Sequence, residues 1–123
     1  MRDVIVRDGM TVVQEDAEII LSDAPIWVRI SNFGIENAKK GTPNLEQLQE
    51  AVGGYIESVE RYMSPVMRSE LEDSRMYGRE ISAVYVNEEG RMRALDYNPF
   101  ATALCGLSVV GPAVIVFHGR GTQ

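Results

Sequence analysis

Cysteine and histidine are nearly missing from this 123-residue chain, which contains one of each. A single cysteine cannot form an internal disulfide, and one histidine without other strong ligands cannot build a zinc site. A lone thiol suits a reducing compartment, so we expect a cytoplasmic protein. No apolar run approaches the roughly 20 residues that span a bilayer. The first residues also lack the pattern of a secretory signal, so we expect no membrane partner.

Positive charge is also scarce, and this limits the partners that the chain can have. The formal net charge is −6, with a sequence pI of about 4.8. A nucleic-acid backbone needs a basic face, so we expect no nucleic-acid polymer as a partner. No phosphate-loop pattern is present, because Gly53 and Gly54 follow a predicted helix instead of preceding one. We therefore expect no cofactor.

What the chain has is enough apolar residues, 45%, to bury a core as one domain over residues 1–123. Short alternating or β-branched runs separated by turn residues predict an α+β fold. Its sheet is mixed but mostly antiparallel, with about five to seven strands. In the run 26–30 we expect Ile26, Val28 and Ile30 to share one face. The candidate strands are 4–6, 11–13, 19–21, 26–30, 55–60, 81–86, 91–95 and 109–117.

Turn residues connect several of these strands. Asp8 and Gly9 indicate an opening hairpin, and residues 31–41 are predicted to be a loop. Residues 87–90, Asn-Glu-Glu-Gly, predict a hairpin turn in which Asn87 makes an Asx contact and Gly90 takes a positive φ. The run 91–95 would then return antiparallel to 81–86. Gly111 and Pro112 interrupt the last strand, which indicates a bulge or an edge position.

Two helices are predicted from cap and proline signals. The main helix covers about residues 43–52, with Thr42 as its N-cap or, alternatively, Asn44 in a capping box with Gln47. A shorter helix covers about residues 99–104, capped by Asn98 and ended by Gly106. Between them, the highly charged segment 61–79 is typical of an insertion between two strands. It is expected to form a short helix or an ordered loop around Pro65.

The order of these motifs resembles that of a known family. The runs Val-Gly-Gly-Tyr-Ile-Glu at 52–57, Asn-Glu-Glu-Gly at 87–90, Asn98 with Ala101 and Thr102, and Gly-Pro-Ala-Val at 111–114 carry the resemblance. The family is the domain of unknown function three-eight-four-six, which is common in phages and mobile elements of bacteria and archaea. The resemblance covers roughly residues 42–117. It implies a phage or mobile-element setting, in the cytoplasm of the host cell, and brings no catalytic residues.

Three arrangements of side chains are candidate sites of chemistry. The first is a nucleophile pair formed by Cys105 and His118. The simpler interpretation is that the thiol is packed in the core and the imidazole lies at the surface. The second is a carboxylate cluster formed by Glu57, Glu88 and Glu89. Against it, Glu88 and Glu89 occupy a turn, where side chains are solvated. We therefore predict no metal site and no catalytic residues.

The third arrangement is a small-ligand site. The helix start at Asn98 offers backbone donors to an anion, and Thr102, Arg91 and Arg93 would complete the site. Glu57 and Tyr55 are its remaining candidate members. A structural role for Asn98 as a helix cap is the competing interpretation.

The sequence does not assign a function, and three hypotheses follow. The preferred one is a non-enzymatic accessory protein that binds a host protein or itself. In that case the long C-terminal strand would pair across the axis of a homo-oligomer. The alternative is a protein that binds or sequesters a small signalling nucleotide. An enzyme that uses Glu57 or Cys105 ranks third.

Overall fold

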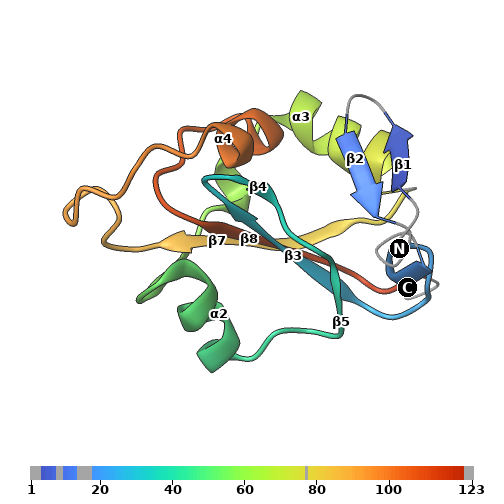
Figure 1. Ribbon diagram of the computed structural model, residues 1–123, viewed down its shortest axis with the longest axis horizontal. Coiled ribbons are helices and arrows are strands. Elements are labelled where there is room, and N and C mark those ends of the chain that lie inside the picture. Colours follow the sequence, from blue (N-terminus) through green and yellow to red (C-terminus); the bar gives the residue numbers. More distant parts are fainter. Residues whose placement is uncertain (1–3, 8–9, 14–17, 77, 121–123) are drawn as a thin grey trace.

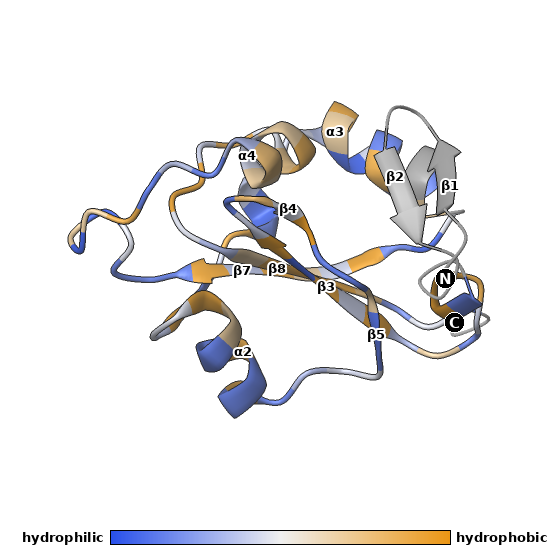
Figure 2. Cartoon of the chain, in the orientation of Figure 1, coloured by the Kyte–Doolittle hydropathy of each residue, from blue (hydrophilic) through white to orange (hydrophobic). Residues whose placement is uncertain are grey.

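The computed structural model describes residues 4–7, 10–13, 18–76 and 78–120. It is an α+β domain in which a six-stranded antiparallel sheet has helices on both faces (Figure 1). The predicted fold class is confirmed. Figure 2 shows why the layers form, since the hydrophobic residues gather along the strands while the outward side of α2 is hydrophilic.

The sheet has the strand order β4-β3-β8-β7-β6, and β5 also pairs with β3. Its long strands are β3 (Ile26–Ser31), β7 (Ile81–Asn87) and β8 (Ala113–Phe117), and its short strands are β4 (Gly34–Ile35), β5 (Lys39–Lys40) and β6 (Ile56–Ser58). All five residues of β8 are buried, as expected for a strand that is covered on both faces. Because β8 pairs with both β3 and β7, it has no free edge. The predicted pairing of this strand across a dimer axis is therefore wrong.

The two faces of the sheet carry separate hydrophobic cores, which the alternation along β3 sets up. Ile26, Val28 and Ile30 lie in the larger core, whereas Trp27 lies in the smaller core beneath α2. This confirms the predicted faces of the strand. The smaller core is completed by apolar residues of α2 and of β8, namely Leu48, Ala51, Val52, Val114 and Val116.

Helix α2 (Leu45–Val52) begins with the capping box that was the alternative prediction. The Asn44 side chain accepts a hydrogen bond from the Gln47 N–H at 2.8 Å, and the Gln47 side chain accepts one from the Asn44 N–H at 2.9 Å. This reciprocal pair satisfies two backbone donors, so the helix starts after Asn44 and Thr42 is not its cap. Gly53 ends the helix with φ at +81°, as predicted.

The other face is covered by the segment 60–75 together with α4. The segment contains the 3₁₀ turn η1 (Glu60–Tyr62), helix α3 (Pro65–Glu70) and the π-helical η2 (Leu71–Arg75). A short helix at Pro65 was one of the two predicted forms and is the form observed. Helix α4 (Pro99–Cys105) is capped by Asn98 and ended by Gly106, also as predicted. A Cβ at Gly106 would lie 2.5 Å from the Ser64 Cβ, so glycine allows α4 to approach the start of α3.

The predicted return strand at 91–95 does not form. Both sides of β7 are already occupied, by β6 and by β8, so a third partner has no place in the sheet. The chain turns instead, and the Leu95 N–H bonds to the Gly90 carbonyl at 2.9 Å. The positive φ falls at Ala94, not at Gly90. Gly90 is needed for another reason, because a Cβ there would lie 2.9 Å from Val110 Cγ2.

Two further predictions near the N-terminal part of the sheet are corrected. Residues 18–20, which overlap the predicted strand 19–21, form a helical turn, and the Ser22 hydroxyl and N–H both bond to the Ile19 carbonyl. The predicted loop 31–41 contains β4 and β5, because the edge of β3 would otherwise be unpaired. The opening hairpin is confirmed as β1 (Val4–Arg7) and β2 (Met10–Val13), which form a separate sheet, while its predicted turn lies outside the described residues.

Candidate functional site

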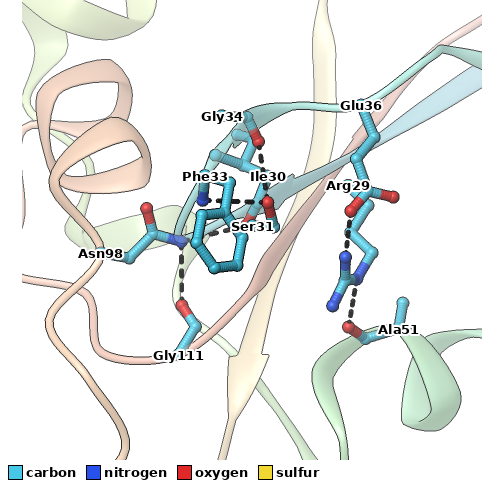
Figure 3. Close-up of polar contacts among 9 residues, drawn as sticks. All are labelled: Arg29, Ile30, Ser31, Phe33, Gly34, Glu36, Ala51, Asn98 and Gly111. Carbon is cyan, nitrogen blue, oxygen red and sulfur yellow. Dashed lines mark hydrogen bonds and ion pairs between the residues drawn. The ribbon is translucent and has the colours of Figure 1, made fainter.

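Asn98, the centre of the predicted ligand site, is fully buried and points into the protein. Its side-chain amide donates to the carbonyls of Ile30 at 3.0 Å and Gly111 at 2.9 Å (Figure 3). Its Oδ1 accepts from the Ala101 N–H at 3.0 Å. Both amide hydrogens are therefore used to join α4 to β3 and to the loop before β8. The geometry is that of a structural cap.

Thr102 is likewise used internally. Its hydroxyl accepts a hydrogen bond from the Val109 N–H at 3.0 Å, which holds the chain that leads from α4 towards β8. Arg93 donates from Nη1 to the Gly53 carbonyl at 2.9 Å. It therefore ties the turn after β7 to the end of α2. Asn98, Thr102 and Arg93 line neither of the two pockets described below.

Glu57 and Arg91 are the two predicted residues that line a common pocket. This pocket has a volume of about 250 Å³, and we call it the β6 pocket. Its apolar floor comes from strand and loop residues such as Val59, Val86 and Val109. The more polar or exposed part of its lining includes Glu57, Tyr62, Glu88, Arg91 and Met92. Tyr55 is exposed immediately before β6 but does not line the pocket.

A second pocket, of about 370 Å³, lies between α2 and β3 and was not predicted. We call it the α2 pocket; Trp27, Arg29, Glu36, Lys39, Gln47, Glu50 and Ala51 line it. The Lys39 ammonium lies 4.6 Å from the centre of the Trp27 ring. Arg29 donates from Nε to the Ala51 carbonyl at 2.7 Å and pairs with Glu36 (Figure 3). The alternation of residues along β3 places Trp27 and Arg29 on the same face, and this pattern was the sequence signal that could have indicated the pocket.

The other chemical candidates do not form reactive groupings. Cys105 is fully buried, and desolvation raises the pKa of its thiol to about 11, so the thiol stays protonated at neutral pH. His118 is exposed beyond the end of β8. Within the described residues, no three His, Cys, Asp or Glu side chains gather in a way that could hold a metal ion. This includes Glu57, Glu88 and Glu89.

Arg79 is a buried charged residue that the sequence did not reveal. Its side chain is 2% exposed, and Nη1 donates to the carbonyls of Ala24 and His118 at 2.6 and 2.8 Å. Nη2 donates to those of Ile20 and Ser22 at 2.6 and 2.5 Å. Nε has no partner among the described residues. Arg79 thus joins the segment 20–24 to the end of β8, and its role is structural.

The comparisons with known proteins leave the function open. No family model, no curated protein and no solved structure matches this chain. Among the described residues, none of the helices is long and apolar enough to cross a bilayer.

Proposed function

We propose that this chain is a non-enzymatic binding module that acts by contacting another protein. One contrast carries the proposal. The polar side chains that chemistry would require are bonded or buried inside the fold, as Asn98 and Cys105 illustrate. Large apolar side chains are instead presented to solvent: the exposed fraction is 94% for Phe33 and 85% for Met92. Exposed aromatic and methionine side chains are typical of protein interfaces.

The setting that we propose is the host-cell cytoplasm, as an accessory protein of a phage or mobile element. Its support is the ordered set of motifs that resembles the domain of unknown function three-eight-four-six. Several motif residues occupy positions that demand their residue type. Gly53 has a positive φ, and Asn87 accepts from the Glu89 N–H while donating to the Val52 carbonyl at 3.1 Å.

Affinity capture combined with light scattering tests the proposed function. The intact chain is immobilised and exposed to host lysate, beside a matched variant that carries Phe33→Ser and Met92→Ser. Both residues are exposed, so the variant should fold as the original does. We expect a stoichiometric partner that the intact chain retains, or a defined homo-oligomer. A strict monomer that captures no partner would contradict the proposal.

The α2 pocket supports a second candidate function, the binding of a small signalling nucleotide. The Trp27 ring with the Lys39 ammonium over it suits a ligand that has an aromatic base and few negative charges, since Arg29 is already paired with Glu36 and Glu50 also lines the pocket. A thermal-shift screen with cyclic and ADP-ribose-type nucleotides tests this candidate. A rise in the melting temperature that Lys39→Ala abolishes would support it, and no shift at millimolar ligand would remove it.

A further inference from the structure

Strand β6 is the outermost strand on its side of the sheet, and one of its edges is open. Its only strand partner in the described part of the chain is β7. Tyr55, Glu57 and Ser58 are exposed, so no other element among the described residues covers this edge. An open strand edge presents backbone donors and acceptors to which another extended chain can bond.

The register with β7 identifies the backbone groups that face outward. The Glu88 N–H donates to the Tyr55 carbonyl at 2.8 Å, and the Val59 N–H donates to the Val84 carbonyl at 2.9 Å. Because hydrogen-bonding direction alternates along an antiparallel strand, residues 55, 57 and 59 face β7. The N–H and C=O groups of Ile56 and Ser58 therefore face the open edge.

The β6 pocket lies beside this edge, on the same face as Glu57. Glu57 and Val59 both line the pocket, whereas Ile56 packs against the core beneath α2. In an added strand, the residue opposite Glu57 would project its side chain towards the same face. That residue would form a non-hydrogen-bonded pair with Glu57, in which side chains lie closest. Its side chain would therefore reach the pocket.

The charge of Glu57 determines which kind of added strand the open edge of β6 favours. If two copies of β6 paired in the register centred on Glu57, the two carboxylates would lie directly opposite one another, which is destabilising. A lysine or arginine opposite Glu57 would be attracted instead. Its aliphatic stem would also suit the apolar floor formed by Val59, Val86 and Val109.

We propose that β6 receives an extended segment of a partner protein as an additional strand. A lysine or arginine of that segment lies opposite Glu57, with its stem in the β6 pocket. This inference rests on the proposed binding function and specifies where the partner docks. Main-chain hydrogen bonds from Ile56 and Ser58 supply the attachment, and the pocket supplies the selectivity.

The experiment uses a displayed library of random heptapeptides, panned against the intact chain. We expect enriched peptides to share a lysine or arginine at one fixed position. Ser58→Pro removes one outward N–H without touching the ladder with β7, so it should weaken these peptides about tenfold. Glu57→Lys should weaken them similarly and, when the panning is repeated, enrich aspartate or glutamate at that position.

Glu46→Lys provides the matched control, since it makes the same charge change on the exposed start of α2, away from the edge. It should leave peptide affinity unchanged, and thermal melts check that all variants fold. Enriched peptides that bind Ser58→Pro and Glu57→Lys as tightly as the intact chain would overturn the inference, as would panning that yields no basic consensus. If the lysate partner is nevertheless retained by the intact chain and by both variants, the binding function stands and only this site is lost.

Discussion

At the scale of single residues, the buried polar groups hold distant parts of the chain together. Asn87, Asn98 and Arg79 are the buried polar or charged residues in the described part of the chain. Each donates to main-chain carbonyls from other segments, so each replaces water that those carbonyls would otherwise bind. Their loss should therefore cost more than the loss of an exposed hydrogen bond.

Arg79→Met should be strongly destabilising. The substitution removes the Arg79 donors from four carbonyl groups in a site where desolvation already lowers the pKa of Arg79. We expect a loss of about 3 kcal/mol in the free energy of unfolding, measured by urea denaturation. Arg120→Met is the control, because Arg120 makes longer bonds, of 3.4 Å to the Ile20 carbonyl and 3.3 Å to the Met76 carbonyl. Equal losses in the two variants would contradict the role assigned to Arg79.

Cys105 should make the stability of the fold depend on alkaline pH. The pKa of the thiol is raised from 9.0 to about 11 by burial, so between these values the unfolded chain loses a proton that the folded chain keeps. Stability is therefore fully present below pH 9 and falls as the pH rises towards 11, by on the order of 2 kcal/mol. Urea denaturation across this range should show a shallower decline for Cys105→Ala. Parallel profiles for the two proteins would show that the thiol does not contribute.

At the scale of elements, the helix starts differ in how far their caps reach. Asn44 caps α2 through an exposed, purely local box, whereas Asn98 both caps α4 and bonds to two other segments. The first cap is a property of four successive residues. The second depends on the packing of the whole domain.

Asn44→Ala should lower the free energy of unfolding by about 1 kcal/mol, as is usual for an exposed cap. Asn98→Ala should cost about 3 kcal/mol, because it also leaves the Ile30 and Gly111 carbonyls buried without a donor. Asn98→Asp separates the two roles, since it keeps the cap acceptor and removes both donors. If Asn98→Asp were as stable as the original chain, the two long-range hydrogen bonds would not contribute to the stability of the fold.

The same distinction explains which elements the sequence predicts. The glycine stop after α2, the Asn98 cap and the alternation of β3 are local, so short patterns indicate them. Residues 91–95 alternate as a strand does, yet they turn, because β6 and β8 already flank β7. The structure does not bring Asn98 and Thr102 into the pocket that Glu57 and Arg91 line, for a related reason. Asn98 and Thr102 carry groups that suit a ligand, and only the fold reveals that other segments use them.

At the scale of the whole molecule, the central strands of the sheet are paired on both sides, and its edge strands carry charged residues. Lys39 and Lys40 lie on the short strand at one edge, and Glu57 lies on the other. Charged residues at sheet edges oppose indiscriminate pairing between molecules. This arrangement permits binding by a complementary strand while limiting aggregation.

Replacing the charge on β6 should therefore favour self-association. Glu57→Thr removes the like-charge contact and adds a β-branched side chain that suits a strand. Sedimentation velocity should show a concentration-dependent dimer for this variant. The original chain should not form this β6-paired dimer. Glu46→Thr, on the outer face of α2, should behave as the original. The absence of any difference between the two variants would mean that Glu57 does not guard this edge.

The central position of β8 also bears on how the protein is made. Residues 26–31 and 81–87 emerge from the ribosome well before residues 113–117, yet these two strands meet only through β8. Until β8 emerges, a growing chain has β3 and β7 with unbonded inner edges, which are open to wrong partners. The domain must consequently fold late in synthesis, and a chain that stops before Ala113 would lack the strand that joins the two halves of its sheet.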